Sequence, residues 1–248
     1  MDDQLTKKPL IEYSVWDKPV RYCHWINVLC VICLIAIGTA ILNSKALGVT
    51  TDGKILLKTW HVYVGYIFAL NLTFRIVWGF IGSSTARWHA ILPVGATYWT
   101  HFSEYIVSLK QRKPVGFLGH NPLARLMVTL LFLLMSIQAL SGLVLAGTDV
   151  YMPPFGGVIK QWIAVDDASV DKIKPYSKES VDEQAYQEMR AFRKPFIKTH
   201  YAVFYILLGA IVLHLFGVIV TEVREGNGIV SAMFTGKKFF KDKPIDLE

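Results

Sequence analysis

The residues of this sequence best suited to chemistry are histidines that lie in or beside long apolar stretches. An ionisable or metal-ligating side chain inside a membrane span is costly, so each such histidine is a candidate ligand. Four of the seven histidines occur there: His24, His61, His200 and His214. A lone histidine near the end of a span is more often an interfacial residue, so ligation is favoured only if the four can be paired.

The spacing of His200 and His214 places both on one side of one helix. They are fourteen residues apart, which is about 21 Å of helical rise, and steps of about 100° per residue leave their directions roughly 40° apart. Two imidazoles at two depths on one helix face are the arrangement that two stacked haems require.

Helix direction then pairs the four histidines. With spans that alternate in direction, His24 and His214 lie near one side of the membrane, and His61 and His200 lie near the other. Depth predicts the ligand pairs His61 with His200 and His24 with His214. Two imidazoles on one iron leave no open coordination position, which favours electron transfer over catalysis at the iron.

The composition indicates which elements position these residues. Of 248 residues, 53% are hydrophobic and 18% are charged, and the apolar residues are gathered into runs. About 20 apolar residues cross a bilayer as a helix. The fold class we predict is an all-α integral membrane protein, a four-helix transmembrane bundle that holds two b haems. The predicted spans are 24–43, 60–82, 123–146 and 199–221, within a domain over 24–221.

The remaining segments are predicted to be tails and connections. Residues 1–23 and 222–248 form the two tails, and 147–198 is a long loop on the periplasmic side. An interfacial helix is expected around 98–109, and helical composition begins near a capping-box pattern from Ser180 to Glu183. Lysines and arginines near the span ends favour both termini in the cytoplasm, and that count includes Lys7, Lys8, Arg112 and Lys113.

Charge and cysteine content exclude several other classes. The net charge is +7, but the basic residues lie between the apolar runs and mark water-facing loops, so no nucleic-acid partner is expected. Cys30 and Cys33 are followed by Leu34 rather than by histidine, which argues against covalent haem attachment, and no disulfide framework is indicated. The polar first twenty residues predict no cleavable signal peptide.

Taken in order, these motifs resemble the bacterial di-haem cytochrome b superfamily. That superfamily includes the b-type cytochrome subunits of nickel–iron hydrogenases, the cytochrome subunits of formate dehydrogenases and the bacterial cytochromes b561. The resemblance covers nearly the whole chain, and it rests on residues 15–25, 60–65, 119–124 and 226–237 together with His200 and His214.

The resemblance implies a function as well as a fold. It implies two haem b groups on the four histidines and electron transfer across the bacterial inner membrane. Electrons would pass between the quinone pool and a periplasmic redox partner of the hydrogenase or multihaem cytochrome c type. The other partner would be membrane lipid, and a homo-oligomer is compatible with the family.

The resemblance also suggests roles for further polar residues. Arg75 would pair with a haem propionate. Quinone candidates near the His24 and His214 haem are Arg21, His120, Asn121 and Arg125. Their alternative roles are helix capping for Asn121 and contacts with lipid phosphates for Arg21 and Arg125.

Small residues in the apolar stretches have two possible roles. They could make room for porphyrin or allow close helix packing. These residues are Gly38, Gly65, Gly142, Gly209 and Gly217.

Two other functions fit the same scaffold. One is a self-standing quinol oxidase of the bacterial cytochrome b561 type that acts on a small oxidant such as superoxide. The other is a transporter without haem, which would be colourless and would have no reason to match histidines by depth.

Overall fold

The computed structural model describes residues 9–111 and 115–247, and these residues are mainly helical. Residues 1–8 of the predicted amino-terminal tail, residues 112–114 and Glu248 lie outside the described part. The basic residues Lys7, Lys8, Arg112 and Lys113, which were counted for the orientation, therefore also lie outside it.

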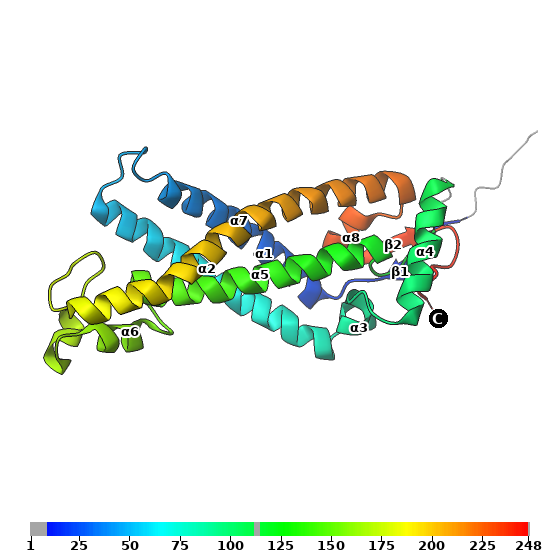
Figure 1. Ribbon diagram of the computed structural model, residues 1–248. Helices are drawn as coiled ribbons and strands as arrows, with labels where there is room; N and C mark the ends of the chain where they lie inside the picture. Colours follow the sequence, from blue (N-terminus) through cyan, green and yellow to red (C-terminus); the bar gives the residue numbers. More distant parts are fainter. Residues whose placement is uncertain (1–8, 112–114, 248) are drawn as a thin grey trace, which may run out of the picture. The chain divides into compact units, whose positions relative to one another are not determined.

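Among the described residues, four helices are long and apolar enough to cross a membrane. They are α1 (Lys18–Leu42), α2 (Thr51–Ile81), α5 (Pro122–Asp149) and α7 (Glu183–Glu225) (Figure 1). Each begins before the span predicted from hydropathy. His24 therefore lies in the second turn of α1, and His61 lies almost three turns into α2, so neither residue opens its helix.

Side-chain caps fix where all four of these helices begin, and Asp17 caps α1 while Thr50 caps α2. Asn121 precedes α5, and its Oδ1 accepts the backbone N–H of Ala124 at 2.8 Å. Asp182 precedes α7 and accepts the N–H of Ala185 at 2.7 Å. Each cap satisfies one of the donors that a helix start leaves unpaired. The capping box expected from Ser180 is wrong, because Ser180 has a φ of 62° and lies two residues before the cap.

Shorter elements fill the connections. The helix expected around 98–109 is α4 (Ala96–Lys110). The others are α3 (Trp88–Ile91), α6 (Gly156–Ile163), α8 (Ile229–Thr235), the 3-10 helices η1 (Ser84–Ala86) and η2 (Asp167–Lys172), and the strands β1 (Ile11–Ser14) and β2 (Lys237–Phe240).

The chain divides into two compact units, and each unit contains part of all four long helices. Unit 1 comprises residues 1–25, 74–132 and 209–248, and unit 2 comprises residues 26–73 and 133–208. Both tails and the connection after α2 belong to unit 1, whereas the other two connections belong to unit 2. Four helices that alternate in direction produce this division.

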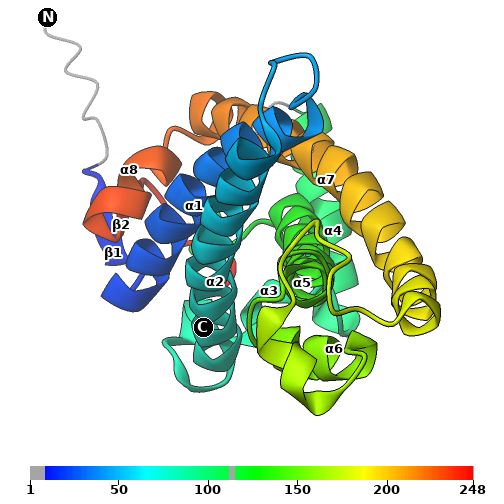
Figure 2. The same cartoon turned by 90° about the vertical axis from the view of Figure 1, so that its left-hand side faces the viewer.

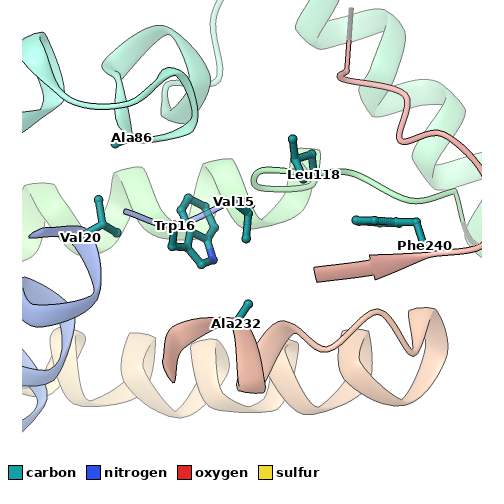
Figure 3. Packing of buried hydrophobic residues seen from close by; sticks show 7 residues of the cluster. All are labelled: Val15, Trp16, Val20, Ala86, Leu118, Ala232 and Phe240. Carbon is teal, nitrogen blue, oxygen red and sulfur yellow. The ribbon is translucent and has the colours of Figure 1, made fainter. Parts of the chain in front are cut away.

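In unit 1, a pair of strands joins segments near the two ends of the chain. β1 pairs with β2 in antiparallel register, with Ile11 opposite Phe240. Beside it lies a cluster of buried apolar side chains, shown in Figure 3: Val15, Trp16, Val20, Ala86, Leu118, Ala232 and Phe240. The described parts of the tails, residues 9–23 and 222–247, are therefore folded into unit 1.

Unit 2 has its own small core in the connection between α5 and α7. Ile159 and Ile163 of α6 pack with Ile173 and with Met189 of α7, and α6 lies beside the end of α5 (Figure 2). Asp149, the last residue of α5, pairs with Lys58 of α2 and with Arg193 of α7, the latter at 2.9 Å. These contacts hold the ends of three long helices together.

Candidate ligand site of the four histidines

His61 and His200 face each other within unit 2. Their ring centroids are 6.4 Å apart and their planes make an angle of 75°. Imidazole–metal bonds are about 2 Å long, so two imidazoles on opposite sides of one iron would have centroids roughly 6 Å apart. The observed separation fits one iron between the two rings.

Two glycines of neighbouring helices make room for these rings. A Cβ at Gly38 of α1 would lie 3.3 Å from Cε1 of His61, and a Cβ at Gly142 of α5 would lie 3.2 Å from Cε1 of His200. At the other three glycines noted in the sequence, Gly65, Gly209 and Gly217, a Cβ would meet nothing within 4 Å. Helices α1 and α5 thus contact the imidazoles of α2 and α7 at positions without a side chain.

The ring of His200 also has polar neighbours on α5. Its Nδ1 lies 3.0 Å from Oγ of Ser141, and its Nε2 lies 3.1 Å from the amide nitrogen of Gln138. His61 differs, because its buried Nδ1 has no hydrogen-bond partner among the described residues. The two rings of this pair therefore have unlike surroundings.

His24 and His214 both belong to unit 1. The neighbouring Trp25 meets the ring of His24 edge-on at 5.3 Å. Trp25 in turn packs against Phe234 with ring centroids 4.6 Å apart and donates its indole N–H to the carbonyl of Met233. Contacts with α8 therefore fix the segment that carries His24.

Arg75 is a buried cation with an unused donor. Its side chain is 7% exposed, its Nη2 donates to the carbonyl of Ala86 at 3.2 Å, and the guanidinium lies over the ring of Phe132. Its Nη1 is buried without a partner among the described residues. A buried N–H without an acceptor is costly, so a carboxylate ligand fits this position.

The four residues predicted to contact a quinone all belong to unit 1, and three of them already bond to protein. Asn121 caps α5 and donates its Nδ2 to the hydroxyl of Tyr105 at 2.9 Å. Arg125 donates to the carbonyls of Ala90 and His89, and Arg21 donates to the carbonyl of Phe234. The capping role left open for Asn121 is the one observed.

His120 is the fourth of these residues. Its ring packs on Trp16 with centroids 4.8 Å apart, and its buried Nδ1 has no partner among the residues described. Burial lowers the pKa of His120 to about 3, and the nearby cation Lys238 contributes to the shift. The ring is therefore neutral near pH 7, with one nitrogen able to donate and one able to accept.

Sequence reasoning missed two residues of the carboxy-terminal tail that bind the turn before His120. Lys238 donates its buried Nζ to the carbonyls of Phe117, Leu118 and Gly119, and burial lowers the pKa of Lys238 to about 8. Asp246 accepts the N–H groups of Leu118 and Gly119. No local pattern identifies these residues, because their partners are more than a hundred positions away.

Comparison with known proteins gives one matching family and several named relatives. The family model described as prokaryotic cytochrome b561 matches residues 15–236. A protein of Cupriavidus necator named as a probable Ni/Fe-hydrogenase B-type cytochrome subunit is 24% identical over 92% of this chain and 87% of its own length.

Two further relatives carry related names. A subunit with the same name from Bradyrhizobium diazoefficiens is 25% identical over 92% of this chain and 86% of its own length. The probable Ni/Fe-hydrogenase 1 B-type cytochrome subunit of Escherichia coli K12 is 28% identical over 55% of this chain and 61% of its own length. No solved structure matches this chain.

Proposed function

Because the chain belongs to the prokaryotic cytochrome b561 family, we propose that it transfers electrons between the quinone pool and a periplasmic redox partner. The protein is a multi-pass membrane cytochrome b with b-type haem, and its four spanning helices agree with that family. We place it in the bacterial cytoplasmic membrane with both termini in the cytoplasm. The hydrogenase names of its relatives support a hydrogenase, or a multihaem cytochrome c, as the partner.

The observation that carries the proposal is the separation of the His61 and His200 rings, 6.4 Å between centroids. We propose two haem b groups, one held by His61 and His200 and the other by His24 and His214. Haem held by two imidazoles supplies one-electron exchange without an open iron position. The protein supplies the four ligands, and it also sets their orientation.

Further residues of unit 1 are proposed to serve the haem of His24 and His214 and the quinone. The unpaired Nη1 of buried Arg75 supports a hydrogen bond to a haem propionate. For the quinone we propose His120 first, because its neutral ring has an unused nitrogen that can bond to a quinone oxygen. Arg21, Asn121 and Arg125 then support the wall of this site through their bonds to the protein backbone and to Tyr105.

The connection between α5 and α7 is the proposed surface for the periplasmic partner. It is folded around its own core, and it exposes Phe155, Val158 and Trp162 of α6 and the preceding turn. The domain proposed from the sequence covers 24–221, with a tail on either side. Within it, the connection between α5 and α7 is the longest segment between two spans. Membrane lipid would surround the spans, and a homo-oligomer is compatible with this arrangement.

Haem content and ligand substitution test the ligand assignment. Pyridine-haemochrome analysis of the purified chain should give two haem b per chain. His61→Ala and His200→Ala should each remove one haem and leave the other, whereas His24→Ala and His214→Ala should remove the second. The exposed His89 provides the control, since His89→Ala should keep both haems. Two haems in His61→Ala or His200→Ala would contradict the assignment.

Purification tests the partner. A stable complex with an iron–sulfur or haem c protein, together with electron flow between that protein and a quinone, is the expected result. Quinol oxidation by the isolated chain with a small oxidant such as superoxide would instead indicate a self-standing quinol oxidase.

A further inference from the structure

We propose that Ser141 is a positioning residue for the haem ligand His200. Its hydroxyl would fix which ring nitrogen carries the proton and would strengthen this imidazole as an iron ligand. This inference rests on the proposed ligation of iron by His200, and it adds a role for α5, a helix that contributes none of the four histidines.

The hydrogen inventory of Ser141 decides the direction of its bond to His200. A serine hydroxyl has one hydrogen to donate and two lone pairs to accept. Oγ of Ser141 lies 2.7 Å from the carbonyl of Ile137, one turn earlier in α5, and 3.1 Å from the carbonyl of Gln138. Both are acceptors, so the hydroxyl hydrogen is directed to them, as is common for serine in helices.

The bond between Ser141 and His200 must then run the other way. Oγ lies 3.0 Å from Nδ1 of His200 and has only lone pairs left for it. Nδ1 therefore carries the proton and donates to Oγ, which leaves the lone pair on Nε2. The contact at Nε2 agrees, because the amide nitrogen of Gln138 lies 3.1 Å away as a donor. Nε2 is thus the nitrogen with the lone pair for a metal, and a metal bound there would replace the contact with Gln138.

Packing restricts the ring as well. Gly142 follows Ser141, and a Cβ there would lie 3.2 Å from Cε1 and 3.7 Å from Nδ1 of His200. The ring edge with Nδ1 and Cε1 thus lies against the backbone of α5, with the hydroxyl beside it. One hydrogen bond and one close backbone approach together define the direction in which Nε2 points.

This arrangement distinguishes His200 from two of the other proposed ligands. The buried Nδ1 atoms of His61 and His24 have no hydrogen-bond partner in the described residues. A hydrogen bond from the distal N–H of a ligating imidazole raises its basicity and stabilises the higher oxidation state of the metal. Ser141 would therefore lower the midpoint potential of the haem held by His61 and His200.

The test uses Ser141→Ala, Ser141→Thr and a matched control. Ser141→Ala removes the acceptor, whereas Ser141→Thr retains a hydroxyl. Ser108→Ala is the control, since Ser108 is also a buried helical serine bonded to a carbonyl one turn earlier, but it lies in unit 1. Each purified variant is analysed for haem content, by optical redox titration, and by electron paramagnetic resonance of the oxidised low-spin haems.

Ser141→Ala should raise the midpoint potential of one haem, change the resonance signature of that haem, and leave the second haem unchanged. Ser141→Thr and Ser108→Ala should both match the parent protein. Loss of one haem from Ser141→Ala, with both retained in Ser141→Thr, would also support the positioning role.

Three results would overturn the inference. They are unchanged potentials and spectra in Ser141→Ala, equal shifts of both haems, and a Ser141→Thr variant that behaves like Ser141→Ala. Failure of the ligand assignment is a separate outcome, because His200→Ala would then retain both haems whatever Ser141→Ala does.

Discussion

At the level of single residues, the candidate site depends on two glycines as well as on the histidines that they contact. Gly38 and Gly142 each lie against an imidazole, on helices that contribute no ligand to that pair. A histidine ring so close to a neighbouring backbone has few rotamers open to it, so packing alone orients the proposed ligand.

A methyl group at one of these glycines should therefore disturb the ligand. In Gly142→Ala the new Cβ would lie 3.2 Å from Cε1 of His200, and such overpacking typically costs about 1–3 kcal/mol. We expect partial or complete loss of the haem proposed for His61 and His200, measured by haem content per chain.

Gly157 in α6 provides the control for that substitution. A Cβ there meets nothing within 4 Å, so Gly157→Ala should bind the same amount of haem as the parent protein. Equal haem content in Gly142→Ala and Gly157→Ala would show that the ring is not restricted by α5.

His120 allows a prediction about pH. Its pKa falls from an ordinary value of 6.5 to about 3 through burial first and the cation of Lys238 second. Between those values the unfolded chain binds more protons at this site than the folded chain, so this residue makes the folded protein less stable as the pH falls.

Substitution of His120 can isolate its contribution to the pH dependence of folding stability. The free energy of unfolding should fall between about pH 6.5 and pH 3, with up to roughly 1.4 kcal/mol per pH unit from this one group. His120→Gln, which does not titrate, should show a smaller decline when unfolding is followed by circular dichroism at several pH values. Identical pH profiles for the two proteins would place the effect elsewhere.

At the scale of elements, polar residues at helix starts position the site. Asn121 caps α5 and also donates to Tyr105, whose hydroxyl donates to Glu225. This chain of bonds connects α4, α5 and the end of α7 within unit 1. The side chain of Asn121 is engaged in these bonds, so it is not free to bind a ligand, although it follows His120 in the sequence.

Two substitutions separate the functions of Asn121. Asn121→Ala removes the cap and should destabilise the protein by about 0.5–2 kcal/mol. Asn121→Asp keeps an oxygen at the cap but loses the donor to Tyr105, so the fold should remain closer to the parent in stability. Thermal unfolding in detergent measures both. Equal losses in the two variants would show that the bond to Tyr105, rather than the cap, dominates.

At the scale of the whole molecule, the carboxy-terminal tail completes unit 1. Lys238 and Asp246 bind the turn at 117–119 through backbone groups, and β2 pairs with β1 near the other end of the chain. The turn precedes His120 and the cap of α5. The tail that follows the fourth span therefore holds the turn that precedes the third span, α5.

Lys238→Met should loosen that turn. It leaves three buried carbonyls without their donor, and an unsatisfied buried group costs about 1–3 kcal/mol. We expect faster hydrogen exchange of the amides at 117–119 and a lower unfolding temperature. Lys241→Met, at an exposed lysine of the same tail, should match the parent. Unchanged exchange at 117–119 in Lys238→Met would exclude a holding role for the tail.

The sequence alone predicted the four apolar spans and the pairing of the histidines, for a physical reason. Both follow from local quantities, because hydrophobic runs of sufficient length define membrane helices, and alternating direction assigns each histidine a depth. The ring separation of His61 and His200 agrees with the pairing made on that basis.

The surroundings of those histidines follow from tertiary packing rather than from local sequence. The acceptor for His200, the glycine against each ring and the tail residues that bind the turn at 117–119 come from segments far away in the chain. Side-chain direction and contact between distant segments depend on packing, which no periodicity records. Ser141 illustrates the difference: in the sequence it is an ordinary helical serine, and in the fold its hydroxyl lies 3.0 Å from a candidate haem ligand.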